Sequence, residues 1–167
     1  MNGENPPSGT FEMFFTSSRR GARLARRVVV RRLEEWGIPR DSDASQSLAL
    51  IAGELTANAV SHGHVPGRHF HLRLSVESPP GPDGRQGPAS ARIEVSDARD
   101  ERRPVVREHG GDDAEGGRGL LLVEALASKW GVAERGVGKT VWCEYALASE
   151  ECRSRQVTGD TGAGDTR

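Results

Sequence analysis

Two segments in the middle of the chain alternate strictly between apolar and polar residues. Every second residue is apolar in residues 69–77 and again in residues 90–96. Successive side chains of a strand point to opposite faces, so this period of two predicts two strands with one buried face each. The inward residues are expected to be Phe70, Leu72, Leu74, Val76, Ala91, Ile93 and Val95. The segment 78–90 between them is rich in proline and glycine and offers no core residue, so a hairpin with a long loop is predicted.

The residues before this hairpin have the spacing of two helices. Ser17 or Ser18 can cap the first helix, which is predicted to run to about Trp36. Its buried stripe is expected to be Ala25, Val28, Val29, Leu33 and Trp36. The second helix is predicted to start at Asp41 or Ser42 and to stop at Gly63. Its apolar face is expected to be Leu48, Ile51, Leu55 and Ala59.

The ends of the chain add one strand before the helices and a helix and two strands after the hairpin. Residues 10–16 form a short apolar run that predicts a strand. Residues 98–116 carry charges and glycines with almost no apolar residue, which predicts a mobile segment. Residues 118–129 predict a helix, with Leu121, Leu122, Ala125 and Leu126 as its core residues. The stretches "WGVAE" and "KTVWCEYAL" predict two strands joined by the turn "RGVG".

The order of these elements restricts the fold. Helices are too few and too badly placed for repeated parallel crossovers. We therefore expect an α+β two-layer sandwich, with a mixed, mostly antiparallel sheet and three helices on one face. The domain is expected to span residues 10–147, between a disordered N-terminus at 1–9 and a disordered tail at 148–167, which have no core-forming residues.

The composition excludes few functions, but it indicates the cellular environment of the protein. The formal net charge of −1 gives no overall electrostatic argument for nucleic acid or membrane. No apolar run is long enough to span a bilayer, no signal peptide is evident, and two cysteines offer no disulfide framework, so a cytoplasmic protein is expected. Four histidines at 62, 64, 69 and 71 lack an accompanying cysteine, and a zinc site is not favoured. Seven arginines crowd residues 19–32, either as a solvated helix face or as a docking surface for an acidic partner.

Polar residues stand where a nucleotide site would need them. Glu54, Asn58 and His62 lie at i, i+4 and i+8, in a column at the edge of the apolar helix face. Asp97 continues the inward side of a strand, where a carboxylate is costly unless it is hydrogen-bonded. The third helix starts among Gly116, Gly117 and Gly119, and free helix amides attract phosphate. An Asn oxygen suits Mg²⁺ and a carboxylate can accept a proton, so the set suggests a purine triphosphate with magnesium.

These motifs, in this order, resemble those of the histidine kinase-like (GHKL) ATPase superfamily, whose ATP-binding fold is the Bergerat type. "ELTANAVSHG" resembles the N-box, "VSDARDERRP" stands where the adenine-reading motif belongs, and "EGGRGLLLVEALASKWGV" resembles the second glycine box. "GKTVWCEYAL" is similar to the closing strand. The short layout resembles the anti-sigma-factor serine-protein-kinase branch (RsbW/SpoIIAB-like), common in actinobacteria. One departure is that Asp97 is followed by Ala-Arg-Asp-Glu, without the glycines that are usual in the adenine motif.

The resemblance implies a role for each matching residue. Asn58 would coordinate Mg²⁺, Glu54 would be the general base, and Asp97 would bind the adenine amino group of ATP. The phosphates would be met by Gly117, Arg118, Gly119 and Leu120. Thr140 would support Asp97.

The resemblance also implies partners and an activity. The partners would be a sigma factor and an anti-anti-sigma (STAS-type) protein, the second of which would be phosphorylated on serine or threonine. Direct contact with nucleic acid or membrane is not expected, and the sequence is compatible with a homodimer. One alternative is a binding module without catalysis, which the missing glycines favour. Another, ranked last, is the detached catalytic domain of a sensor histidine kinase.

Overall fold

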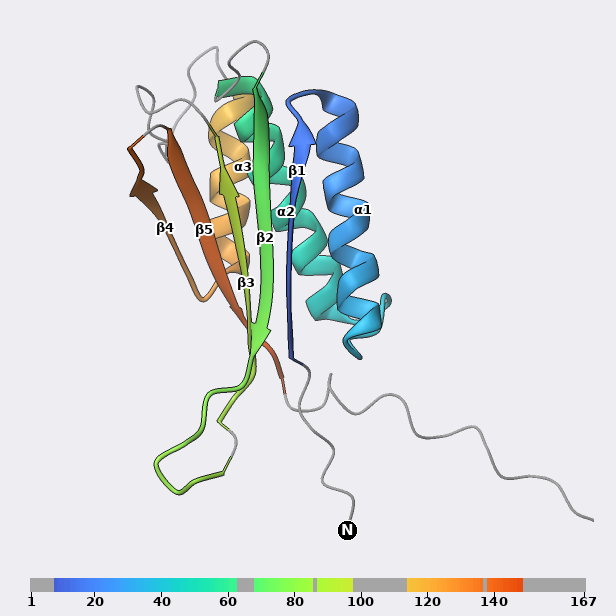
Figure 1. Ribbon diagram of the computed structural model, residues 1–167, viewed down its shortest axis with the longest axis vertical. Coiled ribbons are helices and arrows are strands. Elements are labelled where there is room, and N and C mark those ends of the chain that lie inside the picture. Colours follow the sequence, from blue (N-terminus) through green and yellow to red (C-terminus); the bar gives the residue numbers. More distant parts are fainter. Residues whose placement is uncertain (1–7, 63–67, 86, 98–113, 137, 149–167) are drawn as a thin grey trace, which may run out of the picture.

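The computed structural model describes residues 8–62, 68–85, 87–97, 114–136 and 138–148. They form one sheet and three helices (Figure 1). The strands are β1 (Gly9–Thr16), β2 (His69–Glu77), β3 (Ser90–Ser96), β4 (Lys129–Glu134) and β5 (Lys139–Ala146). The helices are α1 (Arg19–Glu35), α2 (Asp43–His62) and α3 (Ala114–Leu126). The predicted order of elements is confirmed.

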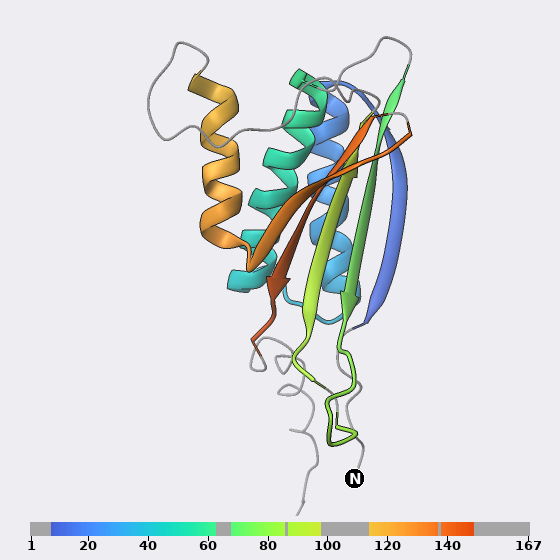
Figure 2. The ribbon, with the colours of Figure 1, turned by 90° about the vertical axis from the view of Figure 1, so that its left-hand side faces the viewer.

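The sheet has the strand order β1-β2-β3-β5-β4, and the helices lie along one of its faces (Figure 2). All four pairings between the described strands are antiparallel, whereas the sequence predicted a mixed, mostly antiparallel sheet. The β2–β3 pairing is the predicted hairpin, with Leu74 opposite Ile93. The α+β two-layer sandwich is confirmed. Among the described residues, no helix is both long enough and apolar enough to cross a membrane.

The core lies between the sheet and the helices. All seven residues predicted to face inward from β2 and β3 are buried. They meet Leu33 of α1 and the face of α2 that contains Leu48, Ile51 and Leu55. Burying a large aliphatic side chain contributes about 1.5–3 kcal/mol, so this shared core holds α1 and α2 on the sheet. Ala89, assigned from sequence to the loop, is also buried, because its carbonyl accepts a hydrogen bond from the amide of Leu147.

Local hydrogen bonds define the helix ends as the sequence predicted. The Ser18 hydroxyl accepts from the amide of Gly21 at 3.0 Å, and the Ser42 hydroxyl accepts from the amide of Ser45 at 3.1 Å. Each bond satisfies a first-turn amide that has no partner within its helix. At the end of α1, Gly37 has φ of 90°, and the amide of Ile38 donates to the carbonyl of Leu33. This left-handed turn is why glycine ends the helix.

Two predictions about α3 are wrong. The helix begins at Ala114 rather than Arg118, so its glycines lie within it. Its buried residues are Leu120 and Val123, whereas Leu121 is 39% exposed. Residues 120–123 are all apolar, so the helical spacing of apolar residues does not indicate which of them face the core. That face is set by packing, because α3 lies beside α2 as well as above β4 (Figure 2).

The first strand, β1, begins at Gly9, one residue before the expected strand. Residues 1–7 of the predicted disordered N-terminus, residues 149–167 of the predicted tail and residues 98–113 of the predicted mobile segment lie outside the described residues.

The buried thiol of Cys143 should be unreactive in the folded protein. Burial raises its pKa from 9.0 to about 12, because the thiolate would lose its hydration. We expect Cys143 in a Cys152→Ser variant to resist a thiol reagent at pH 8 and to react at once after unfolding in urea. The raised pKa favours the folded state below pH 9, and this contribution is lost as pH rises towards 12. Rapid labelling under native conditions would contradict the burial.

Candidate functional site

Several element ends that carry predicted site residues lie at one end of the molecule. They are the C-terminal end of α2, the N-terminal end of α3, the end of β3 and the start of β5 (Figures 1 and 2). Because α2 and α3 pack side by side over the sheet, residues more than 60 positions apart come together there.

Glu54 of α2 lies directly against Gly119 of α3. A Cβ atom placed on Gly119 would overlap the Oε2 atom of the Glu54 carboxylate. The carboxylate therefore occupies the space that any larger residue at 119 would need. A larger residue at 119 would require the flexible end of the Glu54 side chain to move, and the contact links the N-box column to the second glycine box.

Asn58 lies one helical turn after Glu54 and is half-buried. Its Nδ2 atom is buried and has no hydrogen-bond partner among the residues that the structure describes. A buried polar group without a partner costs about 1–3 kcal/mol, so such a group points to a ligand. Rotation of the carboxamide by 180° exchanges its nitrogen and oxygen, and the oxygen is a suitable ligand for Mg²⁺. Asn58 thus fits the metal that the family motif implies.

Asp97 directly follows β3 and is only 7% exposed. Its Oδ2 atom lies 3.6 Å from Nζ of Lys139, which is also buried, and its amide donates to the Lys139 carbonyl at 3.0 Å. The ammonium group compensates the desolvation of the carboxylate. Asp97 is therefore held in place as a buried acceptor by the first residue of β5.

The family resemblance predicts that Thr140 supports Asp97, and no sequence motif points to Lys139. In the structure, Thr140 Oγ1 hydrogen-bonds Ser96 Oγ at 2.7 Å, one residue before Asp97. The pairing of Ser96 with Thr140 places Lys139 beside Asp97. Lys139 begins β5, and pairing β5 with β3 brings this lysine opposite Asp97. A predicted β3–β5 pairing would therefore have identified Lys139 as a partner of Asp97.

The second glycine box differs from the predicted phosphate loop. Gly117 and Arg118 lie in the first turns of α3, and the side chain of Arg118 is outside the described part. Gly119 is the sixth residue of α3, so the free amides belong to the turn before it. Leu120 is buried, which leaves only its backbone available to a ligand. Phosphate binding by these residues stays a prediction, as does a single cavity for Asp97, Asn58 and Gly119.

The Glu54–Gly119 contact predicts that alanine substitutions at Gly53 and at Gly119 change the free energy of unfolding by different amounts. Gly53→Ala in α2 should stabilise the fold by about 1 kcal/mol, the helix-propensity gain of alanine, because the new Cβ meets only Arg26 at an ordinary distance. Gly119→Ala should gain clearly less, because it must displace the Glu54 carboxylate. Urea unfolding of both variants, with and without Glu54→Ala, measures the coupling. If Gly53→Ala and Gly119→Ala raised the free energy of unfolding equally while Glu54 is unchanged, the result would contradict the contact.

An antiparallel sheet covered on one face by three helices, with a carboxylate and a carboxamide on the middle helix near a glycine-rich helix start, defines a two-layer nucleotide-binding domain. Residues 15–145 match the family described as the histidine kinase-like ATPase domain. The chain belongs to this family. Membership implies an ATP-binding domain.

Two known proteins show the extent of the likeness. An uncharacterized protein of Streptomyces coelicolor, SCO4941, is 40% identical over 55 residues, which cover 33% of this chain and 52% of that protein. The match thus spans about half of the relative's length. A crystal structure of the RsbU and RsbW domains of Rv1364c from Mycobacterium tuberculosis is similar with a TM-score of 0.53 and 20% identity. It covers 82% of this chain and 32% of that one, and at this identity it supports the fold alone.

Proposed function

We propose that the chain is an ATP-binding regulatory protein of the anti-sigma type, which transfers phosphate from Mg-ATP to serine or threonine of an anti-anti-sigma antagonist and sequesters a sigma factor. The observation that carries the proposal is the contact of Glu54 with Gly119 beside the buried amide of Asn58, whose Nδ2 atom has no hydrogen-bond partner in the described part of the chain. A carboxylate and a metal-binding amide one turn apart are the groups that phosphoryl transfer needs from this helix.

Each residue of the site has a distinct task in this proposal. Glu54 accepts the proton of the attacking hydroxyl group. Asn58 holds Mg²⁺, whose chemistry when bound is to neutralise charge on the triphosphate. Asp97, fixed by Lys139, accepts a hydrogen bond from the adenine amino group. The segment from Gly117 to Leu120 packs near the phosphates, and Thr140 steadies the end of β3 through Ser96.

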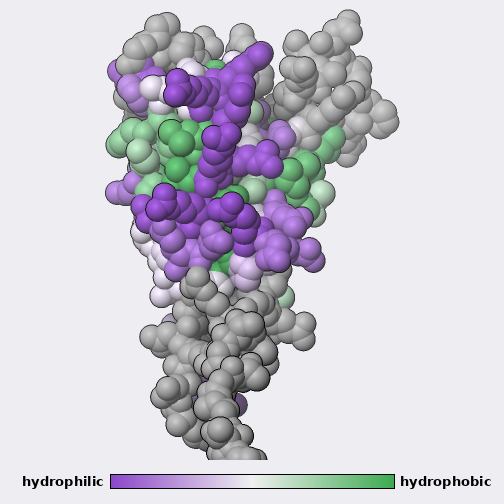
Figure 3. Space-filling model, turned by 90° about the vertical axis from the view of Figure 1, so that its right-hand side faces the viewer, coloured by the Kyte–Doolittle hydropathy of each residue, from purple (hydrophilic) through white to green (hydrophobic). Residues whose placement is uncertain are grey.

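A second candidate is a binding module that captures a partner without catalysis. It is favoured by the surface of α1. The arginines at positions 19, 20, 23, 26 and 27 form no ion pair with a described residue, whereas Arg31 and Arg32 pair with Glu35. Leu24 is half exposed among them, and this side of the molecule shows hydrophilic side chains next to hydrophobic ones (Figure 3). Such a surface fits an acidic partner with apolar contacts.

A phosphotransfer assay separates the two candidates. The wild type, Glu54→Gln and a matched Glu124→Gln variant on the exposed side of α3 are incubated with γ-labelled ATP, Mg²⁺ and a STAS-type protein that the chain binds. The kinase proposal expects label on the antagonist with the wild type and with Glu124→Gln. It expects a loss of at least about 100-fold with Glu54→Gln, as is typical for removal of a general base.

The same assay has two outcomes that count against the kinase. No transfer by the wild type to an antagonist that it binds supports the binding module. Equal transfer by the wild type and Glu54→Gln would show that Glu54 is not the base. Bound ATP, measured in parallel by equilibrium dialysis, distinguishes a failure of chemistry from a failure of nucleotide binding.

A further inference from the structure

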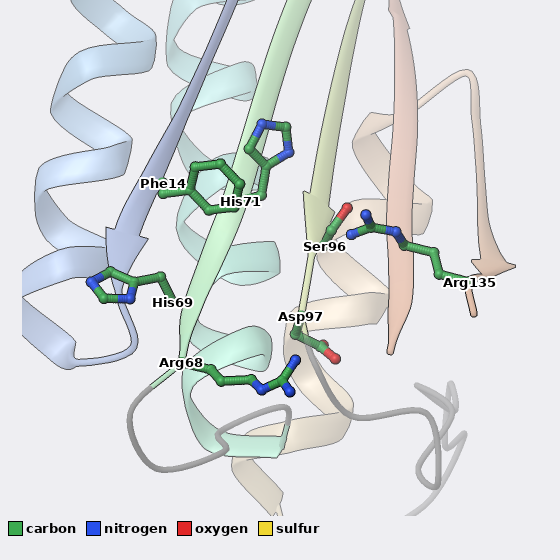
Figure 4. Close-up of a pocket in the computed structure, with 7 residues that line it drawn as sticks. All are labelled: Phe14, Arg68, His69, His71, Ser96, Asp97 and Arg135. Carbon is green, nitrogen blue, oxygen red and sulfur yellow. The ribbon is translucent and has the colours of Figure 1, made fainter. Parts of the chain in front are cut away.

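The outer face of the sheet carries a depression at the same end of the molecule as the candidate site. It has a volume of about 580 Å³ and lies on the side opposite the helices (Figure 4). Its walls come from the end of β1, the start of β2, the end of β3 and the residue after β4. Its volume is in the range of pockets that hold a small ligand or a few side chains.

Two arginines contribute positive charge to the depression. Arg68 and Arg135 form no ion pair with a described residue, although both line the same space from different segments (Figure 4). The only carboxylate in the described wall is that of Asp97, whose charge is already matched by Lys139. The described part of the wall therefore has an excess of positive charge. Arginine side chains bind carboxylate and phosphate groups in a bidentate manner, which makes an oxyanion the natural ligand.

The floor of the depression is aromatic. Phe14 is 68% exposed, and its ring lies 4.7 Å from the ring of His71, centroid to centroid, at a tilt of 47°. Nε2 of His71 lies 3.7 Å from the carboxylate of Glu12, so this histidine is turned towards an acidic neighbour as well. An exposed phenylalanine on the same side of the sheet as two arginines suits a ligand that combines an anionic end with an apolar stem.

We propose that this depression binds an acidic segment of a partner protein, whose carboxylate or phosphate groups are held by Arg68 and Arg135 and whose side-chain stems pack on Phe14. A polynucleotide is disfavoured, because the net charge of the chain is −1 and the same sheet face carries Glu12, Glu94 and Glu144. The proposal rests on the depression alone and stands whether or not the chain transfers phosphate.

Nuclear magnetic resonance titration tests this assignment. The full chain is titrated with a short peptide that has one phosphoserine between glutamates, with its unphosphorylated form, and with inorganic phosphate. We expect saturable shifts at the amide of His71 and at the Nε–H groups of Arg68 and Arg135, and tighter binding of either peptide than of inorganic phosphate. Equal or tighter binding of inorganic phosphate would overturn the proposal in favour of a free-anion site.

Variants locate the binding. Arg68→Gln and Arg135→Gln should each weaken the peptide about tenfold, the loss expected for one charge-assisted hydrogen bond. Arg85→Gln is the matched control, because Arg85 is exposed in the β2–β3 loop and pairs with Asp83. Phe14→Ser should weaken the peptide without changing the affinity for inorganic phosphate. Unchanged peptide affinity in both Arg68→Gln and Arg135→Gln, or an equal loss in Arg85→Gln, would overturn the proposal.

Discussion

Replacing Asn58 with alanine is expected to weaken Mg-ATP binding by about 100-fold, the upper end of the losses seen when a metal site is disturbed. Its buried Nδ2 atom makes no hydrogen bond within the described residues, so we expect the side chain to contribute little to the fold without nucleotide. The free energy of unfolding of the nucleotide-free variant should therefore change by less than about 1 kcal/mol. Calorimetric titration with ATP and urea unfolding measure the two effects separately.

Two comparisons make the Asn58 experiment specific. Ser61→Ala is a matched variant, because Ser61 is exposed on the same helix and should bind Mg-ATP like the wild type. In EDTA, the wild type and Asn58→Ala should bind ATP equally weakly, since the difference between them is carried by the metal. Wild-type affinity of Asn58→Ala in the presence of Mg²⁺ would remove Asn58 from the metal site.

Much of the fold was predictable because local patterns agree with packing. The strict alternation in β2 and β3 fixes one buried face, and the structure buries that face. Ser18, Ser42 and Gly37 mark helix ends through bonds that depend only on neighbouring residues. Such short-range signals are complete in the sequence, so the order of elements and the two-layer architecture follow from them.

Contacts between distant segments were not predictable in the same way. The buried face of α3 depends on how that helix lies on α2, and its run from Leu120 to Val123 is apolar on every side. The close contact at Gly119 depends on Glu54, 65 residues earlier in the numbering. The motif order predicted that these residues share one end of the domain, but not which of them touch.

The outer depression shows the same limit for polar residues. Alternation placed His69 and His71 on the polar side of a strand, where the simplest interpretation is solvent. Only the pairing of β1 with β2 brings Phe14 next to His71, and only the sheet order brings Arg68 and Arg135 to one hollow. Polar positions have no burial signal to organise them, so a surface site made from several strands is invisible to periodicity.

The largest loss of stability is expected from Lys139→Met. The Asp97 and Lys139 side chains are 5% and 6% exposed, so Lys139→Met removes a positive charge that lies 3.6 Å from a buried carboxylate. Breaking one side of a buried ion pair costs about 3 kcal/mol or more, whereas replacing both sides with neutral groups is often nearly neutral. Urea unfolding should therefore show a large loss for Lys139→Met and a partial recovery for Lys139→Met combined with Asp97→Asn.

Partial recovery of stability in the double variant distinguishes an electrostatic role of Lys139 from a contribution of its packing alone. Lys129→Met at the exposed start of β4 is the matched control and should change the free energy of unfolding by less than about 0.5 kcal/mol, as is usual for surface positions. A double variant as unstable as the sum of the two single variants would mean that Lys139 does not stabilise the fold through Asp97. A positive coupling means that Lys139 stabilises this end of the sheet through Asp97 and holds that carboxylate in place for a ligand.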